Sequence, residues 1–113
     1  MKFVLKVDTE RLKATELIGI IKLVDDPAIL DELAKSNKSK GVWIAIAQNE
    51  NVSGETCNYI IDYCINNVKG SWMITEAMAK NPKVSKVILD KLIETARTDD
   101  VIKFARKNPN YQK

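Results

Sequence analysis

A six-residue pattern that occurs three times constrains the fold of this chain more than any other feature. Each copy has two apolar residues, an aspartate, one variable residue and two further apolar residues. The copies occupy residues 29–34, 60–65 and 88–93, so they begin 31 and 28 positions apart. A fixed period of roughly 20–50 residues is typical of repeat proteins, in which each unit buries its apolar face against the next.

Two further landmarks recur in the same order as this pattern. The segment Lys40-Gly41-Val42-Trp43 is echoed 29 positions later by Lys69-Gly70-Ser71-Trp72. An asparagine then follows each short apolar stretch, at Asn49, Asn81 and Asn108. Three landmarks in one order indicate a repeated unit rather than chance similarity.

The spacing of apolar residues predicts that each unit is a pair of helices. Apolar residues at 57, 60, 61, 64, 65 and 68, and again at 89, 92, 93 and 96, follow the three-and-four spacing of a helix that buries one stripe. These longer helices are expected to begin at Asp26-Pro27, Ser53 and Ser85, which are typical N-terminal residues. Gly41 and Gly70 are expected to end the helices that precede them.

Shorter helices are expected over residues 42–48, 72–80 and 101–107, ending at Asn-Pro or its equivalent, because proline does not continue a helix. Residues 1–25 are expected to form an N-terminal arm and cap. Within it, residues 2–7 form a short strand or an extended arm, and Thr9 caps a helix with a buried stripe. That stripe comprises Leu12, Leu17, Ile20, Ile21 and Val24.

The expected fold is therefore all-α. Helix pairs that cannot bury their apolar faces alone must stack, which predicts an α-solenoid of about three pairs over residues 26–110. The N-terminal helix caps this stack. Residues 1–113 then form a single domain, as their length also indicates.

Residues 79–84, 87–93 and 104–109 resemble the leucine-rich repeat variant, in which a short helix ending in Ala-x-Asn-Pro alternates with a longer helix. The resemblance covers residues 26–110 and is strongest from Trp72 onward. It implies a right-handed superhelix that serves as a scaffold for binding macromolecules, with no activity attached. Asn49-Glu50 lacks the proline, and the longer period is similar to that of HEAT-like helical pairs. The cysteine cluster that holds an iron–sulphur centre in some members is absent.

The chain contains no histidine, which removes every Ser-His, Cys-His and His-metal arrangement. Cys57 and Cys64 are seven positions apart in an expected helix, so their Cα atoms lie roughly 10 Å apart and cannot form a disulfide. Two thiols are too few for a structural zinc site, and a buried core position is expected for both. We therefore predict no catalytic residue, no cofactor and no metal, and the chain is not expected to be an enzyme.

The chain is expected to be cytoplasmic. Lys6 and Asp8 interrupt the apolar start of the sequence, which excludes a secretory leader. The longest apolar run, residues 42–47, is too short to cross a membrane. Two cysteines that cannot pair are typical of a reducing compartment.

The acidic residues are expected to have structural roles. Asp25-Asp26 and Asp99-Asp100 precede expected helices, where they would cap amides and complement the helix dipole rather than act as acid–base pairs. The repeated Asp31, Asp62 and Asp90 are expected to be solvated or to bond to turns. A ladder of ligand-binding acids is the alternative.

The repeated tryptophans and asparagines are also assigned structural roles. Trp43 and Trp72 occupy matching motif positions and are expected to be buried between repeats; if Trp72 is exposed, it becomes a candidate interface residue. Asn49, Asn81 and Asn108 are expected to bond to the backbone of their own turns, with a recognition ladder as the alternative.

The charge distribution points to a binding surface in the last third of the chain. Residues 1–79 carry net charge −2, and residues 80–113 carry net charge +5. In a stack of repeats, Lys80, Lys83, Arg106 and Lys107 should form a basic ridge along one edge. This ridge favours an acidic protein partner, of which the chain would be a small regulator or inhibitor. A ridge that only keeps this end of the stack soluble is one alternative. Binding of nucleic acid, with Lys86 and Lys103 also contacting phosphates, is the other.

Overall fold

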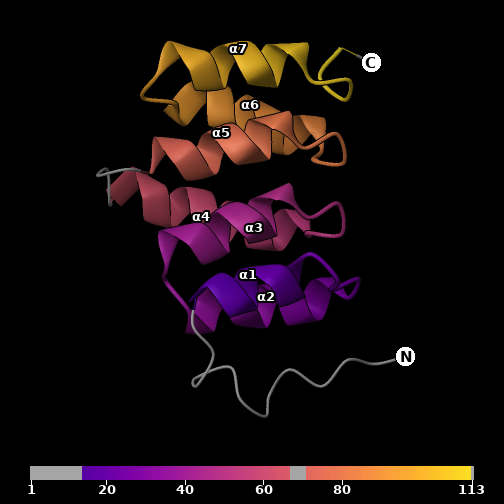
Figure 1. The fold of residues 1–113 in the computed structure, drawn as a ribbon. Helices are drawn as coiled ribbons and strands as arrows, with labels where there is room; N and C mark the ends of the chain where they lie inside the picture. The colour runs from indigo at the N-terminus through magenta and orange to yellow at the C-terminus, as the bar shows by residue number, and fades with distance from the viewer. Residues whose placement is uncertain (1–13, 67–70, 113) are drawn as a thin grey trace.

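The computed structural model describes residues 14–66 and 71–112, and every regular element in this part of the chain is an α-helix (Figure 1). The seven helices are α1 (Ala14–Ile21), α2 (Pro27–Ser36), α3 (Lys40–Gln48), α4 (Gly54–Asn66), α5 (Trp72–Lys80), α6 (Lys86–Thr95) and α7 (Asp99–Lys107). The all-α prediction is therefore confirmed. The expected arm over residues 2–7, Thr9, Leu12 and Gly70 lie outside the described residues.

The helices form two rows. Helices α1, α3, α5 and α7 pack in succession along one row, and α2, α4 and α6 pack in succession along the other. All turns that lead from the first row to the second lie on one side of the molecule (Figure 1). Among the described residues, no helix is long and apolar enough to span a membrane.

The core lies between the two rows and draws on both. Each of the seven helices contributes at least one fully buried side chain. These include Leu17, Leu30, Ile46, Ile60, Met78, Leu89 and Val101. Complete burial of one such side chain stabilises the fold by about 1.5–3 kcal/mol. The predicted apolar stripe of α4 is confirmed at Cys57, Ile60, Ile61 and Cys64, whereas Ile65 is partly exposed.

The predicted starts of the longer helices are confirmed by hydrogen bonds. The Asp26 carboxylate accepts from the backbone N–H of Ala28 at 2.9 Å, and Pro27 is the first residue of α2. Ser53 Oγ accepts from Thr56 at 3.1 Å, and Ser85 Oγ accepts from Ile88 at 3.4 Å. Each hydroxyl or carboxylate satisfies one of the free amides at a helix start.

Asp99 and Asp100 lie in the first turn of α7, where negative charge complements the helix dipole. The cap itself is the preceding residue: Thr98 Oγ1 accepts from Val101 N at 3.4 Å. Helix α7 therefore begins two residues before the predicted start at residue 101. Helix α5 has its predicted bounds of 72–80.

The role assigned to Gly41 is wrong. Helix α2 ends at Ser36 with Asn37 as its C-cap, and Gly41 is the second residue of α3. A Cβ atom at Gly41 would lie 3.1 Å from Ile18 Cδ1, because α1 packs closely on the first turn of α3. This glycine therefore permits close helix packing and does not end a helix.

The three repeated asparagines connect successive turns of the first row. Each is buried, and each side-chain amide donates two hydrogen bonds to backbone carbonyls of the preceding turn. Asn49 donates to Ile21 and Val24, Asn81 to Ala47 and Asn49, and Asn108 to Ala79 and Asn81, all at 2.8–2.9 Å. We call this chain of hydrogen bonds the asparagine ladder.

The same asparagines also bond to their own turns, as predicted. Their Oδ1 atoms accept from the backbone N–H groups of Asn51, Lys83 and Asn110 at 2.7–3.0 Å. Each side chain therefore satisfies the backbone of two turns at once. Because all three are buried and fully bonded, they do not form the recognition ladder that was the alternative.

The segment from Asn49 to Asn81, which we call the middle unit, is longer than the segment from Asn81 to Asn108. The ladder spans 32 positions from Asn49 to Asn81 but only 27 from Asn81 to Asn108. Helix α4 has 13 residues, whereas α2 and α6 have 10 each. The additional residues of this unit therefore lie at the end of α4 and in the link to α5.

Candidate functional site

Four of the predicted binding residues lie along one edge of the first row. Lys80 ends α5, Lys83 is in the turn between α5 and α6, and Arg106 and Lys107 end α7. The asparagine ladder places the turns after α5 and α7 next to each other, because Asn108 donates to the carbonyl of Asn81. We call these four residues the basic edge.

The chain after α7 joins the two parts of the basic edge. The side-chain amide of Asn110 donates to the carbonyls of Pro82 and Val84 at 2.7 and 2.8 Å. These two residues flank Lys83 in the turn, so the segment that follows Arg106 and Lys107 contacts the loop that carries Lys83. Two successive turns therefore present one continuous charged surface.

The positive charge of this edge is largely uncompensated. The sequence contains no carboxylate in residues 77–89 or 101–113. The side chains of Lys83, Arg106 and Lys107 are exposed, and no carboxylate of the described residues forms an ion pair with them. Such a surface attracts negative charge from a distance, and this attraction weakens as salt concentration rises.

Two neighbouring lysines are partly neutralised or lie on aromatic rings. Lys80 forms an ion pair with Glu76 at 3.1 Å, and its Nζ lies 4.3 Å from the centre of the Phe104 ring. Lys86 Nζ lies 5.4 Å from the Tyr111 ring. These contacts hold the ammonium groups of Lys80 and Lys86 on neighbouring side chains, whereas the described residues make no such contact with Lys83, Arg106 or Lys107.

The fifth predicted binding residue, Trp72, lies away from the basic edge. It begins α5, whereas Lys80 ends that helix, so the two are separated by about 12 Å along the helix axis. Its side chain is 45% exposed, so the predicted burial of Trp72 is wrong, while that of Trp43, which is 1% exposed, is confirmed. The structure does not join Trp72 and the basic edge into one site.

The longer middle unit explains why the two tryptophans differ. Counting back from the asparagine that ends each helix, the position of Trp43 corresponds to Thr75, and that of Trp72 corresponds to the exposed Lys40. The two sequence motifs match at a spacing of 29, but the helices that carry them repeat at a spacing of 32. The similarity of the motifs therefore does not give similar environments.

Trp72 belongs to a small group of exposed apolar residues at the end of α4 and the start of α5. Ile65 and Met73 are 36% and 41% exposed. Ile65 and Trp72 line a shallow hollow of about 20 Å³ together with Arg97, whose guanidinium donates to the carbonyl of Ile65 at 3.0 Å. This group is a second exposed surface, separate from the basic edge.

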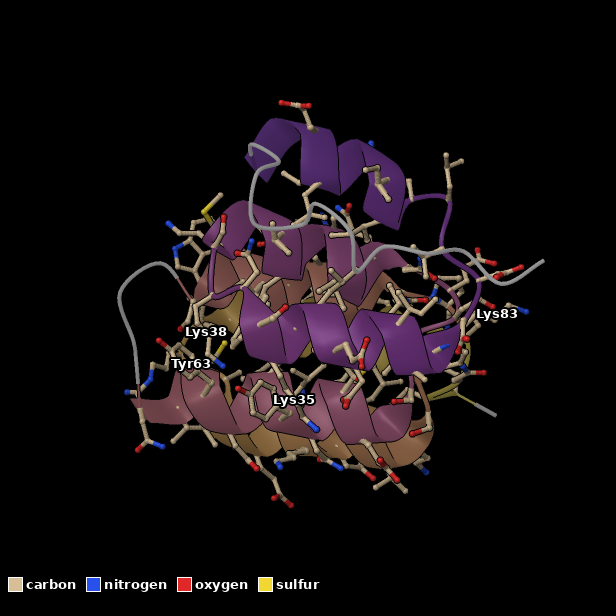
Figure 2. All side chains as sticks on the ribbon, turned by 90° about the horizontal axis from the view of Figure 1, so that it is seen from below. Lys35, Lys38, Tyr63 and Lys83 are labelled. Carbon is tan, nitrogen blue, oxygen red and sulfur yellow. The ribbon has the colours of Figure 1, made fainter. Side chains whose placement is uncertain are left out.

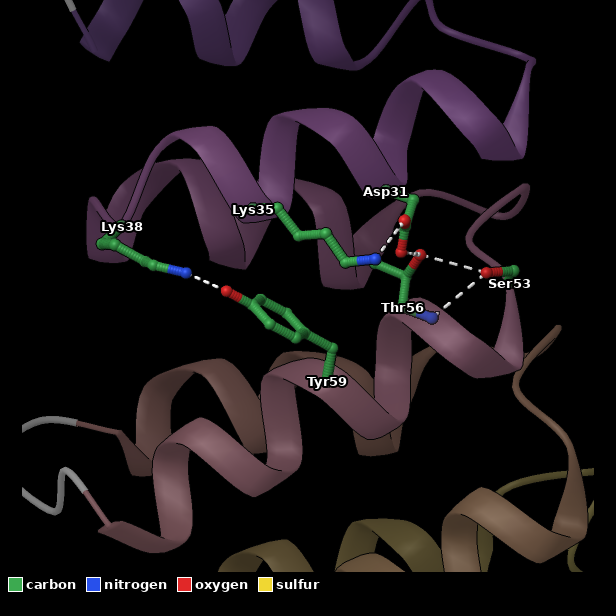
Figure 3. A network of polar contacts seen from close by, with 6 residues as sticks. All are labelled: Asp31, Lys35, Lys38, Ser53, Thr56 and Tyr59. Carbon is green, nitrogen blue, oxygen red and sulfur yellow. Dashed lines mark hydrogen bonds and ion pairs between the residues drawn. The ribbon is translucent and has the colours of Figure 1, made fainter.

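Two of the repeated aspartates link neighbouring helices. The predicted solvated or turn-bonding role is wrong for Asp31, which is partly buried, whereas Asp62 is solvated as predicted. Asp31 in α2 accepts from Thr56 Oγ1 of α4 at 2.7 Å and pairs with Lys35 at 2.8 Å (Figure 3). Asp62 in α4 pairs with Lys91 of α6, also at 2.7 Å. The hydrogen bond from Lys35, followed by that from Thr56, lowers the pKa of the Asp31 carboxyl below its ordinary value. Asp90 is exposed.

Both cysteines are core residues, as predicted. Cys57 and Cys64 are 1% and 5% exposed. Burial raises the pKa of the Cys57 thiol to about 12 and that of Cys64 to about 11, because the apolar core disfavours the thiolate. Within residues 14–66 and 71–112, no three His, Cys, Asp or Glu side chains are arranged to hold a metal ion.

One cluster was missed by the sequence reasoning. Trp43 of α3 and Tyr59 and Tyr63 of α4 surround the ammonium group of Lys38, whose Nζ lies 4.5–5.4 Å from the three ring centres. Tyr59 and Tyr63 are four positions apart, and this spacing, which puts both rings on one face of a helix, was the available signal. Their proximity to Trp43 depends on how α3 packs on α4.

Comparisons of this chain with models of protein families, with curated proteins and with solved structures give no match.

Proposed function

We propose that this chain is a non-enzymatic protein-interaction module that binds an acidic surface of a partner protein through the basic edge. The observation that carries this proposal is the set of uncompensated cations at Lys83, Arg106 and Lys107, on two turns that the asparagine ladder holds together. Fixed backbone positions reduce the entropy lost when such side chains meet a partner.

We further propose that the two rows of helices form an α-solenoid of three helix pairs, α2–α3, α4–α5 and α6–α7, with α1 as the N-terminal cap. The right-handed superhelix and the kinship to the leucine-rich repeat variant or to HEAT-like pairs belong to this proposal. Its support is the successive packing within each row and the recurrence of the buried asparagine. Such solenoids offer extended surfaces to macromolecular partners.

A protein partner is favoured over nucleic acid by the position of the aromatic residues. Proteins that bind single-stranded nucleic acids usually offer exposed aromatic faces on which bases stack. Beside the basic edge, Phe104 and Tyr111 are only partly exposed, and Lys80 and Lys86 lie over their rings. Val87, in the same turn as Lys86, is 76% exposed and adds an apolar contact that suits a protein surface.

The test is a capture experiment on three forms of the immobilised chain, using lysate of the source organism with and without nuclease. The forms are the unaltered chain, Lys83→Glu/Arg106→Glu, and the control Lys22→Glu/Lys40→Glu, which reverses two exposed lysines outside the basic edge. We expect a protein that survives nuclease treatment and is retained by the first and third forms but lost from the second.

Two results would contradict the proposal. Equal recovery by all three forms would show that the basic edge does not bind the partner. Recovery that disappears with nuclease would assign the edge to nucleic acid. Circular dichroism and thermal unfolding of each form establish that the reversed charges leave the helices intact.

A further inference from the structure

Three aromatic rings converge on one ammonium group at a site separate from the basic edge. Lys38 Nζ lies 4.5 Å from the ring centre of Tyr59 and 5.4 Å from those of Trp43 and Tyr63. We call these three residues the aromatic cage. Figure 2 shows Lys38 beside Tyr63 at the opposite end of the helices from Lys83.

The cage is held by contacts that do not involve Lys38. The Trp43 indole N–H donates to the carbonyl of Ala34 at 3.0 Å, which fixes its ring at the end of α2. The Tyr63 ring packs edge-to-face on Trp43 with centres 4.9 Å apart, and the Tyr59 ring packs similarly at 6.0 Å. The rings are therefore already oriented for a cation by the packing of α3 on α4.

The present occupant indicates what the cage accepts. Lys38 lies in the link between α2 and α3, and the residues on either side, Asn37 and Ser39, have extended backbone angles. Lys38 also contacts the Tyr59 hydroxyl (Figure 3) and forms no ion pair with any described carboxylate. The cage thus holds a lysine side chain that projects from an extended segment.

The chemistry of the cage favours an alkylated ammonium. Its walls are aromatic faces and edges, and the ammonium group that they surround, that of Lys38, forms no ion pair with a carboxylate of the described residues. Aromatic rings attract a cation through their quadrupole, and groups of such rings are the usual binding site for quaternary ammonium and methylated lysine. Methyl groups also bury apolar surface against the rings.

We propose that the aromatic cage is a binding site for a methylated lysine on an extended segment of a partner protein, and that Lys38 is an internal occupant that competes with it. The site is independent of the basic edge, because it uses other helices and the opposite end of the molecule. Its apparent affinity is reduced by the fraction of molecules in which Lys38 fills the cage.

The experiment uses the full chain with Trp72→Phe, in which Trp43 is the only tryptophan. This chain is titrated with an extended peptide that carries trimethyllysine, and binding is followed by the fluorescence of Trp43. We expect Lys38→Ala to bind the peptide about tenfold more tightly than the parent chain, because the competing ammonium is gone. The matched control is Lys40→Ala, which removes an exposed lysine two positions away and should leave the affinity unchanged.

Two comparisons test the nature of the site in the Lys38→Ala chain. A peptide in which carbon replaces the charged nitrogen should bind about tenfold more weakly, since it has the shape of trimethyllysine without the charge. Tyr63→Phe should retain binding, and Tyr63→Leu should lose it, while thermal unfolding shows that both remain folded.

Three outcomes would overturn the proposal. One is a folded Lys38→Ala chain that does not bind the peptide more tightly than the parent chain. Another is equal affinity for the charged peptide and its neutral counterpart. The third is tighter binding of phosphatidylcholine vesicles than of the peptide, which would assign the cage to a lipid headgroup.

Discussion

The side-chain amide of Asn108 donates to the backbone carbonyl of Asn81 at 2.8 Å, and Asn81 in turn donates to the carbonyl of Asn49 at 2.9 Å. A side chain of one turn thereby satisfies the backbone of the turn before it. These bonds keep the turns after α5 and α7 in contact, and the cations of the basic edge occupy those two turns. The same bonds thus support the fold and position the proposed binding surface.

Replacing Asn81 with alanine should destabilise the protein strongly. The side chain is 3% exposed and bonds to Ala47, Asn49 and Lys83, so its loss leaves buried backbone groups without partners. We expect the free energy of unfolding to fall by about 2–4 kcal/mol, measured by urea denaturation. Asn51→Ala is the control, because that side chain is exposed; its effect should stay within about 0.5 kcal/mol. A loss of stability for Asn81→Ala no larger than that of the control would contradict the ladder.

The two tryptophans should behave differently in fluorescence. In a Trp72→Phe chain, the remaining Trp43 is 1% exposed and should give blue-shifted emission that iodide quenches poorly. In a Trp43→Phe chain, the remaining Trp72 is 45% exposed and should be quenched readily. Similar quenching constants for the two variants, with the helical content unchanged, would contradict the burial of Trp43 and the exposure of Trp72.

The thiols should react slowly in the folded protein. Burial raises the pKa of Cys57 to about 12 and that of Cys64 to about 11, so the reactive thiolate is scarce at pH 8. Ellman's reagent should label both residues quickly only after denaturation. Because these folded-state pKa values lie above the unfolded one, stability is retained below the unfolded pKa and declines as pH rises from about 9 toward 11. A Cys57→Ala/Cys64→Ala chain should show a shallower decline, and rapid labelling of the native chain would refute the buried state.

Asp31 should contribute to acid sensitivity. Its folded-state pKa lies below the ordinary value of 3.8, so its contribution to stability is present at neutral pH and is lost as the pH falls through the folded-state pKa. Asp31→Asn should reduce this loss, as measured by thermal unfolding between pH 6 and pH 2. Asp90→Asn is the control, because it removes an exposed aspartate at the matching position of the third copy of the repeated pattern. Asp31→Asn should change the pH profile more than this control does. Identical profiles for Asp31→Asn and the parent chain would show that the contacts of Asp31 with Lys35 and Thr56 do not contribute to acid sensitivity.

Local signals in the sequence were sufficient to predict where the longer helices begin. Asp26, Ser53 and Ser85 cap the helices they were expected to cap, because capping depends on residues only two or three positions away. The turn bonds of the repeated asparagines were predicted for the same reason. Their bonds to the preceding turn span 25–34 positions, so they depend on how the helices pack, which the sequence pattern alone does not specify.

The wrong predictions for Gly41 and Trp72 come from patterns that involve only a few neighbouring residues. Glycine often occurs at a helix end, which is the basis of the wrong prediction for Gly41, but the closeness of Ile18 gives this residue a packing role. Trp72 matches Trp43 in a four-residue motif, but the longer α4 shifts the register of the following helix, so the two side chains differ in burial. The basic edge could be predicted because its cations flank the asparagines that mark each turn. The aromatic cage could not, because its members meet only through the packing of α3 on α4.

The proposed binding of an acidic partner protein to the basic edge is tested most directly by titrating the captured partner with three forms of the chain at low and high salt. We expect the parent chain and Lys22→Glu/Lys40→Glu to bind with the same affinity, which weakens steeply as salt rises. Lys83→Glu/Arg106→Glu should bind at least about tenfold more weakly at low salt, a difference of about 1.4 kcal/mol. Equal affinity of all three forms, with no dependence on salt, would show that the basic edge does not bind the partner.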